Sequence, residues 1–269
     1  PTASSFNYGG YTAPFDMAIF VLLVGGVATL VTWDENFGNN ENAEGPCSPA
    51  AMQRAIDLMK RTPPIVLCGA IQSFFEGAMY TFVFMWTPAL TPPGSSPPYG
   101  QIFATFMVCC MAGSSMYPII AKSMEPVQIL QKVMAVSAVS LSMPMLTSSP
   151  TMIFGGFLCF EFAVGLYFPA ISTLKSTVVP EASRAAIYNL FRVPLNVIVL
   201  GVLLSDISTT TAFACCTALL AAGFYFTLQI AGYSLEETAS AEALDDVEKG
   251  VQMQEKNLDD LLGGDAEGL

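Results

Sequence analysis

The amino-acid sequence predicts an all-α polytopic membrane protein with seven transmembrane helices. Of its 269 residues, 53% are hydrophobic and only 12% are charged, whereas soluble domains carry roughly a quarter of their residues as charges. Crossing about 30 Å of hydrocarbon takes about 20 residues of helix, and the sequence contains apolar runs of that length. These runs are continuous, whereas the strands of a membrane barrel alternate polar and apolar residues.

The seven apolar runs predict the helices in order. They lie at approximately 15–33, 64–88, 101–120, 129–147, 152–174, 185–204 and 210–231. The fourth is the weakest, because it is short and contains Ser137, Ser140, Ser142 and Pro144.

The segment between the first and second runs is the longest connection. Within it, Met52, Ile56 and Met59 would share one face of a helix over Pro49 to Arg61, while charged residues occupy the other faces. This pattern is typical of an amphipathic helix on the cytoplasmic membrane surface. An ordinary polar linker with one helical turn is the alternative.

The basic residues predict the orientation. Nine of the ten lysines and arginines lie in or beside alternate connections or in the C-terminal tail, and the opposite connections, 89–100, 148–151 and 205–209, contain none. Cytoplasmic loops are enriched in lysine and arginine, so the N-terminus is expected outside and the tail in the cytoplasm. The expected localisation is a multi-pass protein of the cell membrane.

The two ends of the chain differ from the apolar middle. Eleven of the 22 acidic residues lie between Glu236 and Glu267, in a segment that is too polar to bury a core and is therefore expected to be disordered. At the other end, the chain begins with Pro1 and contains no segment typical of a signal peptide. We therefore expect the sequence to be a fragment of a longer protein.

Several functional classes are unlikely on composition. The chain contains no histidine, which excludes a histidine-ligated zinc site and a Ser/His catalytic pair. Six of the seven cysteines, all except Cys47, lie within apolar runs and form no disulfide framework. We expect no enzyme, no cofactor, no bound metal and no nucleic-acid partner.

Three ionisable residues lie deep within the predicted spans. At 1.5 Å per residue, Glu76 is about 18 Å and Arg192 about 10 Å from the cytoplasmic ends of their spans, and Glu161 is about 14 Å from the outer end of its span. Burying a charge at this depth costs at least about 2.5 to 3.5 kcal/mol. Such residues normally face a partner or a water-filled cavity.

Polar neighbours extend these positions into two stripes. Asn189, Arg192 and Asn196 lie within roughly 60° of one helix face. Gln72, Glu76 and Tyr80 follow one another at intervals of one turn on another helix. The stripes predict a binding site or pathway, with Glu161 as a further member. The alternative is that Glu161 and Arg192 form a buried ion pair that joins two helices.

Five ordered segments resemble the molybdate-anion transporter family of the major facilitator superfamily. They are TWDENFG (32–38), GAIQSFFEGAMYTFVFMWTPAL (69–90), IFATFMVCCMAGSSMY (102–117), CFEFAVGLYFPAISTLKSTVVPE (159–181) and NLFRVPLN (189–196). The family's motif positions carry over as Glu76, Trp86, Glu161, Gly165, Tyr167, Pro169, Arg192 and Pro194. The superfamily's basic loop signature is degenerate, because only Lys122 remains of it after Gly113.

The resemblance implies a twelve-helix protein in two halves, of which this chain carries spans six to twelve. Residues 1–33 would be an outer stub and the last helix of the N-terminal half, and 34–63 a cytoplasmic linker. Residues 64–231 would be the C-terminal six-helix bundle, and 232–269 the acidic, disordered cytoplasmic tail. Further partners would be the missing N-terminal half and the lipid bilayer.

The function that the resemblance implies is secondary transport of a small oxyanion, molybdate, by alternating access. An arginine fork with amide donors on the same face suits a tetrahedral dianion, so Arg192, Asn189 and Asn196 would bind it. Glu76 and Glu161 would orient the arginine or carry a coupled proton. The alternatives are a seven-helix receptor, which has the same topology, and a truncated membrane protein that does not transport.

Overall fold

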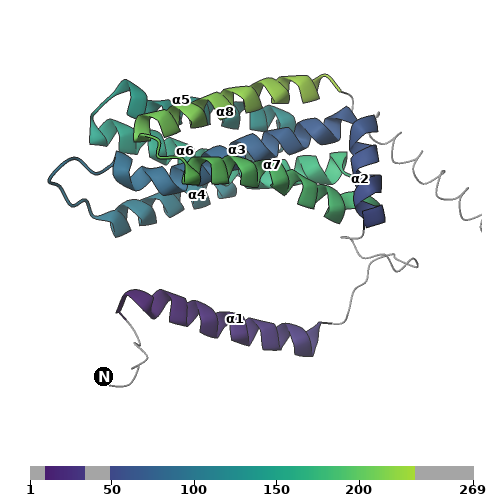
Figure 1. The fold of residues 1–269 in the computed structure, drawn as a ribbon, viewed down its shortest axis with the longest axis horizontal. Helices are drawn as coiled ribbons and strands as arrows, with labels where there is room; N and C mark the ends of the chain where they lie inside the picture. Colours follow the sequence, from purple (N-terminus) through teal and green to yellow (C-terminus); the bar gives the residue numbers. More distant parts are fainter. Residues whose placement is uncertain (1–9, 34–48, 234–269) are drawn as a thin grey trace, which may run out of the picture. The chain divides into compact units, whose positions relative to one another are not determined.

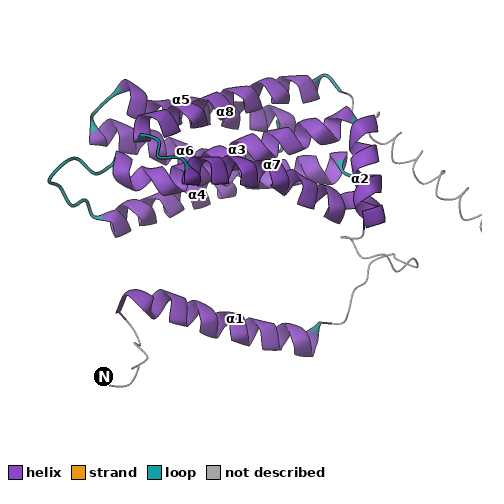
Figure 2. Ribbon diagram, viewed as in Figure 1, coloured by secondary structure: helices purple, strands orange, loops and turns teal. Residues whose placement is uncertain are grey.

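The computed structural model describes residues 10–33 and 49–233, which are helical apart from short connections (Figures 1 and 2). It divides into two units, 1–44 and 45–269, and each is considered by itself. Three predictions concern residues outside the described ranges: the outer stub before residue 10, the part of the cytoplasmic linker over 34–48 and the disorder of the tail after Tyr233.

The first unit contains a short 3-10 turn, Gly10–Thr12, followed by α1, Ala13–Thr32. Its 20 residues extend about 30 Å, enough to cross the hydrocarbon core. Apolar side chains surround α1 on all sides and are exposed along its whole length. A helix that is apolar all round is suited to a lipid environment.

The second unit begins with α2, Pro49–Arg61, so the helix that the sequence left open is present. Its apolar face is half-buried at Met52, Ile56 and Met59, and Ala55 is fully buried. These residues face the ends of α3 and α7, against which α2 packs. The position of α2 at the membrane surface stays a prediction.

The remaining six helices agree with the predicted spans to within a few residues. They are α3 (Pro63–Ala89), α4 (Tyr99–Ile120), α5 (Pro126–Leu146), α6 (Pro150–Val178), α7 (Arg184–Leu204) and α8 (Thr209–Ala231). All are long and apolar enough to cross a membrane, as is α1. The fold class predicted from the sequence is confirmed, and the chain is a multi-pass membrane protein.

The six helices pack in the spatial order α7, α3, α8, α5, α6, α4, and α3 also contacts α6. The helices α3 and α6 are therefore the most buried, and α4 and α7 the least. The connections 90–98 and 147–149 lie at one end of this bundle, opposite α2 (Figure 1). This alternation agrees with the grouping of basic residues at a single end.

Close contact between α4 and α6 depends on two glycines. A Cβ added at Gly113 would overlap the carbonyl oxygen of Phe162, and one at Gly165 would overlap that of Cys110. Ser114 Oγ donates a hydrogen bond of 3.0 Å to the Gly165 carbonyl oxygen. Small residues and interhelical hydrogen bonds of this kind hold helices together where lipid removes the hydrophobic driving force.

Candidate functional site

The polar stripe on α3 runs from the protein interior to its surface. Gln72 is buried, Glu76 is half-buried and Tyr80 is exposed. The Gln72 side chain lies beside Glu76, and its Oε1 is a buried atom that lacks a hydrogen-bond partner within the described part of the chain. Leaving a buried acceptor without a hydrogen bond costs free energy. Gln72 Oε1 can therefore still accept a hydrogen bond from a group outside the described chain.

Tyr167 of α6 fixes the carboxylate of Glu76. Tyr167 Oη donates a hydrogen bond of 3.2 Å to Glu76 Oε1, and the tyrosine ring is fully buried. The ring stacks on Phe75 of α3, with ring centroids 3.8 Å apart and an angle of 16° between the planes. This aromatic stack holds the hydroxyl toward α3, so Glu76 is positioned by a rigid partner on another helix.

Two cations, Lys175 of α6 and Arg192 of α7, lie within electrostatic range of the Glu76 carboxylate. Among residues 10–33 and 49–233, neither forms a salt bridge with it. The Lys175 Nζ also lies 4.7 Å from the ring centroid of Tyr188, over the face of that ring on α7. Cation–π contact of this kind orients the ammonium group. Helices α3, α6 and α7 thus bring one carboxylate and two cations into one region, which we call the α3–α6–α7 site.

The sequence did not identify Lys175 as a site residue, because it was assigned to the connection after the fifth span. In the structure α6 continues to Val178, so Lys175 belongs to the helix. The run of apolar residues ends at about 174, before the helix does. The available signal was the absence of glycine and proline from residues 175–179, which allows the helix to continue past the end of the apolar run.

The polar stripe of α7 faces away from the bundle core. Arg192 and Asn196 are exposed and Asn189 is half-buried, whereas their neighbour Phe191 is buried. Ser73 Oγ of α3 contacts the carbonyl oxygen of Phe191 at 3.1 Å, and Gly69 leaves space for the Phe191 ring. Anchoring at Phe191 fixes the rotation of α7 and so sets the direction of the stripe.

Glu161 lies on a different side of α6. Only 7% of its surface is exposed, and it acts electrostatically on Cys109 and Cys110 of α4. Tyr167 follows Glu161 by six positions in the sequence, which places the two side chains about 120° apart around the helix. Glu161 therefore faces α4, whereas Tyr167 faces α3.

The ion pair between Glu161 and Arg192, which was the alternative to a binding site, is not formed as a direct contact. Across residues 10–33 and 49–233, no salt bridge or hydrogen bond joins them, and Arg192 acts on Glu76 instead. The reason is the order of the helices: α6 presents Glu161 to α4, while α7 packs against α3. The sequence gives the depth of each charge but not the direction in which it points.

Comparison with known proteins gives the family. A family model of the major facilitator superfamily, described as sugar transporters with 12 transmembrane segments, matches residues 2–168. A protein from Xenopus laevis named molybdate-anion transporter is 34% identical over 199 residues, which are 70% of this chain and 42% of the relative. The chain belongs to the molybdate-anion transporter family of the major facilitator superfamily.

Other members of the family give the same result. A molybdate-anion transporter from Danio rerio is 39% identical over 144 residues, covering 50% of this chain and 29% of the relative. The one from Xenopus tropicalis is 34% identical over 199 residues. The chain therefore spans less than half the length of these curated relatives.

The residues that carried the resemblance to the family have distinct places in the fold. Glu76, Tyr167 and Arg192 belong to the α3–α6–α7 site. Gly165 lies at the crossing of α4 and α6, and Trp86 packs edge-on against Phe106 of the core. These five motif positions thus divide into a polar group around Glu76 and a packing group between helices, whereas Glu161, a further motif position, faces α4 and belongs to neither.

Proposed function

We propose that this chain forms part of a secondary transporter that moves a small oxyanion, molybdate, by alternating access. The observation that carries the proposal is the position of Glu76, held by Tyr167 and acted on by both Lys175 and Arg192. Two cations outweigh one carboxylate, so the α3–α6–α7 site has a net positive charge. The names of the curated relatives support molybdate as the anion.

The chemistry of the side chains favours an oxyanion over a neutral sugar. The planar guanidinium of Arg192 grips two oxygens at once, and an ammonium group such as that of Lys175 adds a point charge. Amides at Asn189 and Asn196 share the α7 stripe with Arg192, and amide NH₂ groups are hydrogen-bond donors. Glu76, held by Tyr167, orients the cations through its charge.

Glu161 is the candidate for a coupled proton. It is buried against α4 and has no salt bridge among the described residues. Carboxylates within the membrane spans of transporters commonly act as proton relays. We therefore separate the two acidic residues: Glu76 organises the anion site, and Glu161 takes up and releases the proton that accompanies the anion.

The α3–α6–α7 site needs further helices to enclose it as a cavity. The helices α4 and α7 are the least buried of the bundle, and binding sites in such transporters lie between two halves near the midplane. We propose that five further family spans, together with α1, complete the cavity, that the protein resides in the cell membrane, and that the acidic tail is cytoplasmic. Residues 1–269 reconstituted alone should not take up molybdate.

Uptake of radioactive molybdate into vesicles tests the function. The protein for this assay carries all twelve family spans, and wild type is compared with Lys175→Gln and with Lys60→Gln as the matched control. Lys60 is exposed on α2, where it pairs with Asp57 of the same helix. We expect lost uptake for Lys175→Gln and normal uptake for the control. Absence of uptake by the wild type would instead favour the receptor or the non-transporting product.

A further inference from the structure

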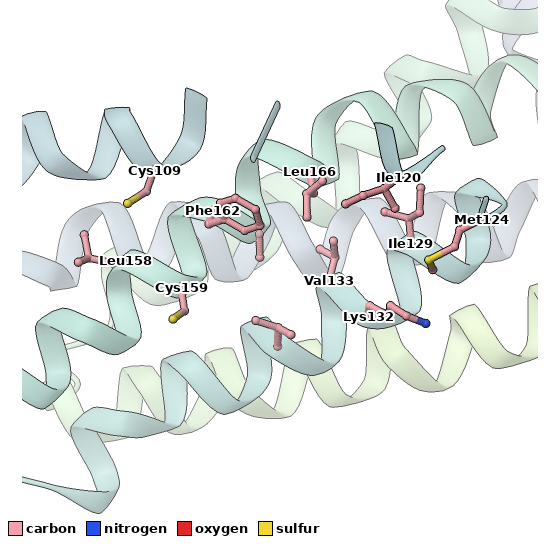
Figure 3. Close-up of a pocket in the computed structure, with 12 residues that line it drawn as sticks. Cys109, Ile120, Met124, Ile129, Lys132, Val133, Leu158, Cys159, Phe162 and Leu166 are labelled. Atoms are coloured by element: carbon pink, nitrogen blue, oxygen red, sulfur yellow. The ribbon is translucent and has the colours of Figure 1, made fainter. Parts of the chain in front are cut away.

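A hollow lies on another side of the bundle from the α3–α6–α7 site, between α4, α5 and α6. It has a volume of about 440 Å³, and its walls are almost entirely apolar. Ile120, Leu158 and Phe162 line it, with Phe162 between the other two (Figure 3). No residue of α3 or α7 lines it, so this groove is separate from the α3–α6–α7 site. We call it the α4–α5–α6 groove.

The length of the groove matches one leaflet of a bilayer. On α4 it extends from Cys109 to Ile120, a distance of about 16 Å at 1.5 Å per residue. The hydrocarbon core of a bilayer is about 30 Å thick, so half of it is close to this length. The groove therefore has the dimensions and the apolar lining that suit an acyl chain of a single leaflet.

One end of the groove carries a cation. Lys132 of α5 lies beside Met124 and Ile129, at the opposite end from Cys109 and Leu158 (Figure 3). Within residues 10–33 and 49–233, Lys132 forms no salt bridge. A lysine near a helix end extends its ammonium group toward the membrane interface and leaves its stem in the apolar region. An unpaired ammonium at the end of an apolar groove favours an anionic ligand.

The groove continues into a polar hollow at the same end. This hollow has a volume of about 470 Å³. It is lined by Lys122 and Ser123 of the connection between α4 and α5 and by Gln128 in the first turn of α5. Met124 lines both hollows. The single carboxylate of the polar hollow, Glu125, forms the capping box that begins α5, in which the Glu125 backbone N–H donates to Gln128 Oε1 at 3.2 Å. Two lysines and one carboxylate leave this end positively charged.

We propose that the α4–α5–α6 groove binds an anionic phospholipid of the leaflet that surrounds the α4–α5 connection. One acyl chain occupies the apolar groove, and the phosphate lies between Lys132 and Lys122 at the polar hollow. A zwitterionic lipid fits the groove equally well but adds its own cation beside the two lysines. The site therefore distinguishes lipids by headgroup charge, and it does so independently of any transported substrate.

Native mass spectrometry of the full chain in detergent tests this site. Phosphatidylglycerol and phosphatidylcholine with identical acyl chains are added at equal concentrations, and the bound ratio is measured for wild type, Lys132→Gln and Lys60→Gln. Lys60 is the matched control, because it is an exposed lysine on α2, which packs on α3 and α7. Lys132→Gln should lower the phosphatidylglycerol preference about fivefold, the effect of one lysine near an anionic surface, and Lys60→Gln should not.

Cysteine labelling locates the bound lipid. Cys159 lines the groove and Cys215 lies on α8 outside it, and both are exposed. Phosphatidylglycerol should slow the reaction of Cys159 with a maleimide and leave that of Cys215 unchanged. Equal binding of the two lipids, equal effects of the two lysine substitutions, or equal protection of the two cysteines would each overturn the proposal.

Discussion

Tyr167 Oη donates a hydrogen bond of 3.2 Å to Glu76 Oε1 and so connects α6 to α3 in the middle of the bundle. The same tyrosine ring stacks on Phe75, one residue before Glu76. A single side chain therefore contributes both packing and polar positioning. Because the two contributions come from different atoms, they can be separated by substitution.

Replacing Tyr167 by phenylalanine keeps the aromatic stack and removes the hydroxyl. A hydrogen bond to a charged group contributes about 1.5 to 3 kcal/mol, so we expect a small loss of thermal stability and a large loss of molybdate uptake in a twelve-span version. Tyr225→Phe is the control, because Tyr225 is exposed on α8. Unchanged uptake at matched abundance would show that Tyr167 has only a packing role.

Gly165→Ala should destabilise the contact between α4 and α6. The new methyl group would overlap the carbonyl oxygen of Cys110, and overpacking of this kind typically costs about 1 to 3 kcal/mol. Gly155→Ala is the matched control on the same helix, since nothing lies within 4 Å of its added Cβ. Thermal unfolding in detergent should show a lower midpoint for Gly165→Ala alone, and equal midpoints for the two variants would contradict the close crossing.

The spans were predictable from the sequence because lipid requires long apolar segments. For example, the run 185–204 corresponds to α7, Arg184–Leu204. The rotation of each helix was not predictable in the same way. Apolar residues surround these helices on most sides, so the sequence pattern gives little indication of which face meets a neighbour.

Because spans can be predicted from the sequence and helix rotations cannot, some candidate site residues were recognised and others were missed. The depth of Glu76 and Arg192 in their spans made both of them candidates. Their place in a binding site stays a prediction. Depth alone also allowed an ion pair between Glu161 and Arg192. No direct contact joins them in the described residues, because the facing direction of Glu161 depends on how α6 packs against α4. Lys175 was missed because the apolar run ends before the helix does.

A double-mutant cycle should measure which acid Arg192 interacts with. The variants are Arg192→Gln, Glu76→Gln and Glu161→Gln, singly and in pairs. Residues without a shared partner usually add to within about 0.3 to 0.5 kcal/mol, so we expect additive effects on unfolding for Glu161 with Arg192 and a larger coupling for Glu76 with Arg192. Strong coupling of Glu161 and additivity of Glu76 would reverse the assignment.

The last prediction concerns the shape of the Arg192 side chain. Arg192→Lys in a twelve-span version should impair uptake of molybdate much more than it impairs folding or insertion. Lysine keeps the positive charge but lacks the planar fork that grips two oxygens at once, and the electrostatic interaction with Glu76 would largely survive the change.

The measurement is molybdate uptake at matched membrane abundance for wild type, Arg192→Lys and Arg192→Leu. Arg192 is exposed on α7, so neither replacement leaves a cavity in the core. Normal abundance with lost uptake in both variants would support direct binding of the oxyanion by the guanidinium group. Near-normal uptake by Arg192→Lys would remove Arg192 from the binding residues, and loss of abundance in both variants would assign it a structural role through Glu76.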